Sequence, residues 1–420
     1  MEMKRWPNLV WVISLISILF LFASARVSWA APDPIKIGAI YSITGTGSAV
    51  GKVQIDGIKL AIKQINDQGG LMIGEKRVKV EAVIRDDETK PDMAVRRYRD
   101  LIQENITFIA GGTFAHIGKA LNEQGRGGEA LIMCTTGIEE AIFQKKEKSP
   151  NYLCSLGAVE AVGRISADYV SKTYKPKNVF LFLPDYAYGR GAFDGASKTF
   201  SSKYPDVKFS VIWSPVGTLD YTSYIVKIAE AKPDVVMMGQ WGNDAINALK
   251  QVHSMGLRKQ TKLHFNSIVS AMAVGIPPEA LEGVSMGMWW YHDLTGFKDV
   301  ETVKATQKLN EVWQKEYGQP PDLMAMYAYV GLMETFRGIQ LANSLEPAKV
   351  YKAILDNPEF RSVKGPAKWR IDGRPDYKYG FFILDGKGPK ERKDPKWDFA
   401  KVVDAYVGEA LCLPLKEMGW

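Results

Sequence analysis

One short stretch of this 420-residue chain combines an apolar strand, two glycines and the start of a helix. Residues 106–110 are β-branched or apolar, which predicts a buried strand that Gly111 and Gly112 end. A helix is predicted from Ile117. A glycine turn before a helix N-terminus leaves several backbone N–H groups unpaired, and such groups suit a carboxylate or a phosphate. The Thr113 hydroxyl adds a possible donor. The alternative interpretation is a tight turn that binds nothing.

Two other glycine-containing stretches come close to motifs of enzymes. Residues 45–51 miss the dinucleotide pattern because the third glycine comes one residue late, and they miss the P-loop pattern in spacing and at Val53. Residues 283–287 match the Gly-x-Ser-x-Gly pattern around Ser285. A nucleophile elbow needs a strand before the serine and a helix after it, whereas here the predicted strand comes after. The sequence therefore favours neither a dinucleotide-dependent enzyme nor a serine hydrolase.

Aromatic residues gather at predicted junctions of strands and loops in the second half of the chain. They are Tyr188, Trp241, Trp289, Trp290 and Tyr291. Aromatic residues at strand ends often fill a core. Several at one edge of a sheet can also form the apolar wall of a pocket.

Asp244 opens a predicted helix that follows the strand 235–238. A carboxylate in this place often caps its own helix. It can also hold the cation of a ligand, because the strand before it ends at the carboxyl edge of a sheet. Both interpretations stay open at this point.

The histidines and cysteines do not form a metal-binding pattern. None of the four histidines has a close His or Cys partner, so neither a metal nor another cofactor is expected. Cys134 and Cys154 could pair in an oxidising compartment, or both could be buried free thiols. Cys412 would be left over.

The predicted elements alternate between strands and helices along most of the chain. Strands are expected at 35–41, 78–84, 106–110, 131–134, 152–156, 179–183, 207–213, 235–238, 263–265, 284–290 and 379–384, and a last helix at 399–413. This alternation predicts an α/β fold with parallel sheets that are covered by helices on both faces. Two runs of about five strands predict two Rossmann-like domains. Ligands bind at the carboxyl edges of such sheets, so two facing edges would form a cleft.

The N-terminus has the pattern of a secretory signal. Lys4 and Arg5 precede the apolar residues 9–23, and small residues at Ser28 and Ala30 predict cleavage after Ala30. The apolar run is short for a membrane span. Charged residues make up 24% of the chain and are spread along it, which gives no sign of nucleic-acid binding.

Several short motifs follow one another in the order typical of one family. They are Ile35-Lys36-Ile37-Gly38, Thr44-Gly45, Gly51, Gly57, Leu60-Ala61, Ile65-Asn66, Gly69-Gly70, Gly74, Asp86-Asp87, Pro91, Ala94, Ile109-Ala110-Gly111-Gly112, Asp185 with Tyr188-Gly189-Arg190-Gly191, Pro233-Asp234-Val235-Val236 and Met255-Gly256-Leu257. With them, nearly all of the chain after residue 30 resembles the leucine/isoleucine/valine-binding protein family.

The resemblance implies a periplasmic binding protein of type I, with two Rossmann-like lobes joined by three crossovers. The N-terminal lobe would comprise residues 31–156 and 289–365, and the C-terminal lobe residues 157–288 and 366–420. Crossovers are expected near Leu156, near Met288 and between residues 363 and 372. The implied protein is not an enzyme. It is a monomeric receptor that delivers an amino acid or a related carboxylate to an ABC permease in the inner membrane.

The resemblance also implies which residues bind the ligand. Gly112, Thr113, Phe114, Ala115, Thr135 and Thr136 would surround its carboxylate, and Tyr188 and Asp244 would bind from the second lobe. Trp241 would lie beside Asp244, and Trp290 is a candidate from the group of aromatic residues described above. Relatives often have a serine where this chain has Ala115 or His116, and a glutamate in place of Asp244. An amino acid other than a branched-chain one, or an aromatic or aliphatic carboxylate, is therefore an open alternative. A sensing module of the same fold that signals to a partner protein is the rival function.

Overall fold

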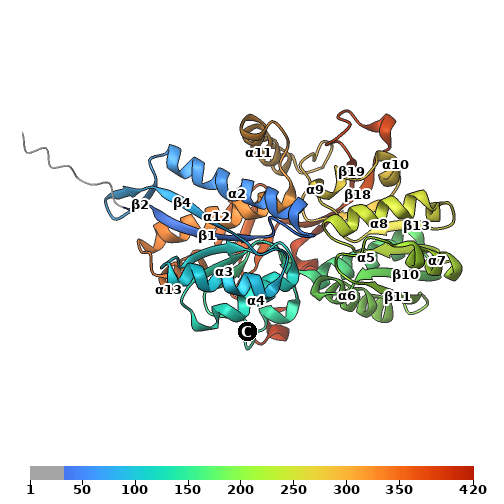
Figure 1. Ribbon diagram of the computed structural model, residues 1–420, viewed down its shortest axis with the longest axis horizontal. Coiled ribbons are helices and arrows are strands. Elements are labelled where there is room, and N and C mark those ends of the chain that lie inside the picture. The colour runs from blue at the N-terminus through green and yellow to red at the C-terminus, as the bar shows by residue number, and fades with distance from the viewer. Residues whose placement is uncertain (1–32) are drawn as a thin grey trace, which may run out of the picture.

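The structure is a computed structural model that describes residues 33–420 (Figure 1). Two lobes lie side by side along the long axis of the molecule, each built on its own sheet. Among residues 33–420, no helix is long and apolar enough to cross a membrane. The expected signal peptide, residues 1–30, lies outside the described residues.

The first lobe has a parallel sheet of five strands in the order β4-β1-β5-β6-β8. Its strands are β1 (Ile35–Tyr41), β4 (Val80–Asp86), β5 (Phe108–Gly111), β6 (Leu131–Cys134) and β8 (Tyr152–Cys154). Its helices are α2 (Ser48–Asp67), α3 (Pro91–Gln103), α4 (Ala115–Gln124), α12 (Leu323–Ala342) and α13 (Pro347–Asp356), and a hairpin joins β2 (Leu71–Ile73) to β3 (Lys76–Val78). Helices α2 and α12 pack closely because Gly57 has no side chain, and a methyl group there would clash with the Ala325 carbonyl.

The second lobe has a sheet of seven strands in the order β11-β10-β12-β13-β14-β18-β19. Its strands are β10 (Asn178–Pro184), β11 (Lys208–Ser214), β12 (Val235–Met238), β13 (Lys262–Phe265), β14 (Ser285–Met288), β18 (Tyr379–Gly386) and β19 (Ala400–Val407). The first five strands are parallel. β18 pairs antiparallel with β14, and β19 pairs antiparallel with β18. Its helices are α5 (Val159–Tyr174), α6 (Ala187–Lys203), α7 (Thr222–Ala231), α8 (Asn243–Ser254), α9 (Ser270–Ala273) and α10 (Pro278–Leu281).

The central strands are apolar throughout because helices cover both faces of the sheet. All four residues of β12 are fully buried. Burial of one such side chain stabilises the fold by about 1.5–3 kcal/mol relative to an exposed one. Continuous apolar runs of this kind are what made these strands predictable from the sequence.

Three crossovers join the lobes. The first leaves β8 through β9 (Gly157–Ala158), which pairs with β7 (Gly137–Ile138), and enters α5. The second leaves β14 towards α11 (Val300–Tyr317). The third passes through a small antiparallel sheet of β15 (Glu359–Ser362), β16 (Gly365–Trp369) and β17 (Pro375–Tyr377) before β18. The two-lobed α/β fold predicted from the sequence is thereby confirmed.

The C-terminal part differs from the sequence-based expectation. The predicted helix 399–413 is wrong, because Ala400–Val407 form the edge strand β19 and pair with β18. Pairing with an existing strand overrides weak local helix preference. The division into lobes also differs, because the last residues leave the second lobe and pack against the first, where the Lys145 N–H donates to the Met418 carbonyl.

The two cysteines whose pairing was open are free thiols in the structure. Cys134 of β6 and Cys154 of β8 are neighbours across the two parallel strands, and both are buried. Both thiols donate to the Thr136 carbonyl, at 3.7 and 3.1 Å. Cys412 is also free.

Candidate ligand-binding site

A narrow cavity of about 20 Å³ lies between the lobes, where the carboxyl edges of the two sheets face each other. It is lined by Thr113, Phe114, Ala115, Thr136, Gly137, Leu156, Val159, Val162, Tyr186, Tyr188, Trp241, Ser267, Trp289 and Met324. None of these lining residues carries a charge. One water molecule needs roughly 10–15 Å³ of such space, so the cavity is too small for an organic ligand. A ligand can enter only if the lobes or their side chains move apart.

The first lobe contributes a group of unpaired backbone donors to this cavity. Gly112 has a φ of +92° and turns the chain between β5 and α4. After this turn, the N–H groups of Thr113, Phe114, Ala115 and His116 have no hydrogen-bond partner among the described residues. Four consecutive N–H groups at a helix N-terminus form a site suited to a carboxylate. The strand, glycine turn and helix predicted here are therefore all present.

The two threonines after β6 occupy different environments. Thr136 lines the cavity, and its hydroxyl donates to the Thr113 carbonyl at 3.2 Å. Thr135 lies beneath the cavity, where its hydroxyl is 3.1 Å from both the Tyr41 hydroxyl and Nε2 of Gln54. Of the two threonines, only Thr136 lines the cavity.

Aromatic residues form the wall of the second lobe. Tyr188 lies between Tyr186 and Trp241, with ring centroids 6.0 and 5.8 Å apart. The Tyr188 hydroxyl and the Ser267 hydroxyl are buried and have no hydrogen-bond partner among the described residues. Burial also raises the pKa of Tyr188, so its hydroxyl keeps its proton and can donate.

Trp290 was expected to line the pocket, and this prediction is wrong by one position. Trp289 lines the cavity, whereas Trp290 points away from it and donates its Nε1 hydrogen to the Thr306 hydroxyl at 3.1 Å. Successive residues of an extended chain point to opposite sides.

Asp244 does not line the cavity. It lies in the first turn of α8, whose N-cap residue is Gly242. Its Oδ2 accepts a hydrogen bond from the Gly217 N–H at 2.8 Å. Its side chain lines a separate hollow with Gly45 and Thr46 at the rim of the cleft. Burial raises the pKa of Asp244 from 3.8 to about 6, and no cation pairs with it among the described residues.

The lobes touch each other across the cleft. The Asn243 N–H donates to the Thr46 carbonyl at 3.2 Å, and the Ala271 N–H donates to Asp322 Oδ2 at 2.7 Å. The rings of Phe114 and Tyr186 lie 5.4 Å apart. The structure therefore shows a closed arrangement.

Several lining residues were not predicted from the sequence. Tyr186 lies between Asp185 and Tyr188, which belong to one of the motifs that carry the family resemblance. Leu156 and Val159 belong to the first crossover, and Met324 lies in the first turn of α12. Nothing in the local sequence of these segments separates a lining residue from an ordinary core residue. Among residues 33–420, no group of three His, Cys, Asp or Glu side chains is arranged to hold a metal ion.

Comparison with known proteins agrees with the two-lobed fold. The family model described as periplasmic binding protein matches residues 34–389. The Leu/Ile/Val-binding protein BraC3 of Rhizobium johnstonii is 26% identical over 358 residues, which cover 84% of this chain and 92% of that protein.

Two solved structures share the fold at low sequence identity. A solute-binding protein of an ABC transporter from Rhodopseudomonas palustris BisB5, in complex with 3,4-dihydroxybenzoic acid, has a TM-score of 0.75 at 20% identity and covers 90% of this chain and 98% of that one. The branched-chain amino acid transporter substrate-binding protein LivJ from Streptococcus pneumoniae, in complex with isoleucine, has a TM-score of 0.73 at 17% identity, with coverages of 88% and 99%. Since the matching family model spans both lobes, the chain belongs to the periplasmic binding protein family.

Proposed function

We propose that the protein is the solute receptor of an ABC importer and binds a small carboxylate between its lobes. The observation that carries this proposal is the row of four unpaired N–H groups from Thr113 to His116, because Thr113, Phe114 and Ala115 line an uncharged cavity together with aromatic residues. The N–H groups would bind the carboxylate, and the Thr136 hydroxyl lies beside them. The aromatic side chains would cover the rest of the ligand.

The same cavity favours an acid without an amine over an α-amino acid. An α-ammonium group would be buried among residues that include no carboxylate, and Asp244 lies in a separate hollow. Burying an unpaired charge costs several kcal/mol, and contact with aromatic faces offsets only about 2 kcal/mol of it. Both solved relatives are complexes with carboxylic acids, and only isoleucine carries an amine. We therefore favour an aromatic or branched aliphatic acid as the ligand.

Delivery to a membrane transporter completes the proposal. The basic and apolar pattern of residues 1–30 supports export and cleavage, with a mature chain that begins at Ala31. A monomeric receptor in the periplasm would then pass its ligand to an ABC permease in the inner membrane.

Titration calorimetry with matched pairs of compounds tests the ligand class. The wild-type protein, unfolded and refolded to remove any solute that co-purified, is titrated with leucine and 4-methylpentanoate, with phenylalanine and 3-phenylpropanoate, and with benzoate. We expect at least one amine-free acid to bind about tenfold or more tightly than its amino acid partner, a difference of about 1.4 kcal/mol. If the amino acids bind and their amine-free partners do not, the proposed ligand class is wrong.

A further inference from the structure

The segment after β19 returns from the second lobe to the first. It leaves the edge of the second sheet at Val407, and Leu411 then packs against Gly380 of β18, where an added methyl group would clash with the leucine side chain. Farther on, Met418 is 2% exposed and its carbonyl accepts a hydrogen bond from Lys145 N–H at 3.0 Å. The chain therefore crosses between the lobes a fourth time.

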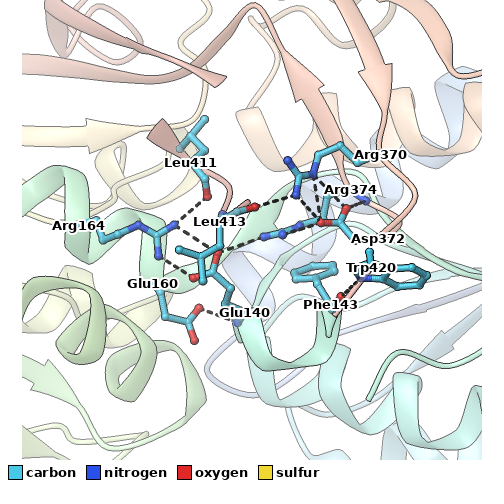
Figure 2. Close-up of polar contacts among 10 residues, drawn as sticks. All are labelled: Glu140, Phe143, Glu160, Arg164, Arg370, Asp372, Arg374, Leu411, Leu413 and Trp420. Carbon is cyan, nitrogen blue, oxygen red and sulfur yellow. Dashed lines mark hydrogen bonds and ion pairs between the residues drawn. The ribbon is translucent and has the colours of Figure 1, made fainter. Parts of the chain in front are cut away.

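The last residue is anchored on the first lobe. Trp420 donates its Nε1 hydrogen to the carbonyl of Phe143 at 2.8 Å (Figure 2). Phe143 ends a short 3-10 helix, Glu140–Phe143, and is fully buried. The Arg374 guanidinium lies 4.3 Å from the centre of the Phe143 ring.

A cluster of buried charges holds the middle of the segment. Figure 2 shows Arg164 of α5, in the second lobe, pointing towards Glu140 of the first lobe. Nη1 of Arg164 lies 2.6 Å from Glu140 Oε2, and its Nη2 donates to the Leu411 carbonyl at 3.0 Å. One arginine therefore ties both lobes to the C-terminal segment.

The small sheet of the third crossover joins the same cluster. Arg370 donates to the Leu413 carbonyl at 2.8 Å and pairs with Asp372 at 2.8 Å. Arg374 bridges Asp372 and Glu140, at 2.7 and 3.4 Å. Arg374 and Asp372 are fully buried, so solvent screens these pairs little.

The cluster is linked to the candidate ligand cavity through the first crossover. The Glu140 N–H donates to Glu160 Oε2 at 2.7 Å. Glu160 follows Val159, which lines the cavity at the start of α5. Movement of this crossover would therefore disturb the cluster and the C-terminal segment together.

We propose that residues 408–420 form a strap that holds the first crossover and limits how far the lobes separate. Opening of the cleft turns the second lobe, which carries Arg164 and the start of the strap, relative to Glu140 and Phe143 of the first lobe, so the contacts of the closed form are disturbed. The strap thereby favours the closed arrangement. Its effect on ligand affinity rests on the proposed function, whereas its effect on opening does not.

The test compares the ligand-free wild-type protein with a variant that lacks residues 414–420. Small-angle X-ray scattering measures the radius of gyration, and hydrogen exchange is followed in residues 139–160. We expect a larger radius in the variant and exchange in this segment about tenfold faster or more. Because no ligand is added, failure of the strap is distinguishable from failure of the proposed ligand class.

Further variants separate a strap from a segment that only adds stability. Trp420→Ala removes the anchor on Phe143 and keeps the chain length. If the deletion variant fails to fold, this variant tests the strap in its place. Lys416→Ala changes an exposed side chain of the strap and should leave both measurements unchanged. Ile228→Val removes one methyl group from the core under α7 and should lower the melting temperature without enlarging the radius. If Trp420→Ala and the deletion speed exchange but leave the radius unchanged, the strap proposal is overturned.

Discussion

Thr135 and Thr136 show how two identical neighbours take different roles. Both follow β6 at the carboxyl edge of the first sheet, and both were candidates for binding the carboxylate. The hydroxyl of Thr135 is occupied by Tyr41 and Gln54, whereas Thr136 faces the cavity. Thr135 therefore supports the loop from below, whereas Thr136 lines the cavity, where its hydroxyl can turn from the Thr113 carbonyl to a ligand.

Thr136→Ala should weaken ligand binding by about tenfold or more, because a hydrogen bond to a charged group contributes about 1.5–3 kcal/mol. Thr135→Val should instead lower the free energy of unfolding by about 1–3 kcal/mol, because Gln54 and Tyr41 lose a partner in a buried place. Calorimetry with the tightest-binding acid and urea unfolding measure the two effects on both variants. Equal affinities of wild type and Thr136→Ala would show that the Thr136 hydroxyl does not bind the carboxylate.

Asp244 presents a different problem, because its carboxylate is buried without a cation. Its hydrogen bond from Gly217 favours the charged form, but burial outweighs this contact and raises the pKa to about 6. A carboxyl group whose pKa is raised in the folded state stabilises the fold most below its ordinary pKa. That contribution is lost as the pH rises from about 4 to about 6.

Asp244→Asn should therefore be more stable than the wild type at pH 8 and equally stable near pH 4. Asparagine keeps an acceptor for the Gly217 N–H and carries no charge at either pH. A shift of about two pKa units limits the gain to about 3 kcal/mol. Urea unfolding at the two pH values measures it. We also expect the affinity for the amine-free acid to stay unchanged. A large loss of affinity would show that Asp244 contributes to ligand binding.

At the scale of elements, strands with a continuous apolar run were predicted well. The expected strands 35–41, 131–134 and 235–238 have the bounds of β1, β6 and β12. Such strands are buried on both faces, so their composition alone identifies them. Edge strand β19 was missed, because its pattern of buried and exposed residues depends on pairing with β18 rather than on its own sequence.

The candidate site was predicted in part for similar reasons. The glycine turn before α4 has a local signature, and the structure places it at the cavity. The choice between Trp289 and Trp290 depends on which face of an extended segment points into the cavity. The sequence does not define the last residue of β14, so the inward-facing position cannot be assigned to one of the two tryptophans. The place of Asp244 depends on how the two lobes meet, which no local pattern encodes.

On the scale of the whole molecule, the closed lobes leave a cavity of only about 20 Å³ between them. Contacts between the rims, from Asn243 to Thr46 and from Ala271 to Asp322, connect the lobes on the side of the cleft. Behind the cavity, three crossovers and the C-terminal segment connect them on the other side. A ligand must therefore enter an open form, in which the rim contacts are broken and the crossovers bend.

Ligand binding should shift the population of the protein from this open form to the closed one. A ligand between the carboxylate site of the first lobe and the aromatic wall of the second lobe contacts both only when the lobes are closed, so it binds the closed form more tightly. Small-angle scattering should show that the ligand-free protein has a larger radius of gyration than the closed structure. The profile at saturation with the tightest-binding acid should match the closed structure.

The Thr136→Ala variant provides the control. At the same acid concentration its binding site is only partly occupied, so its scattering profile should be intermediate. Identical profiles with and without the acid, under conditions where calorimetry shows full occupancy, would mean that the ligand enters without rotation of the lobes.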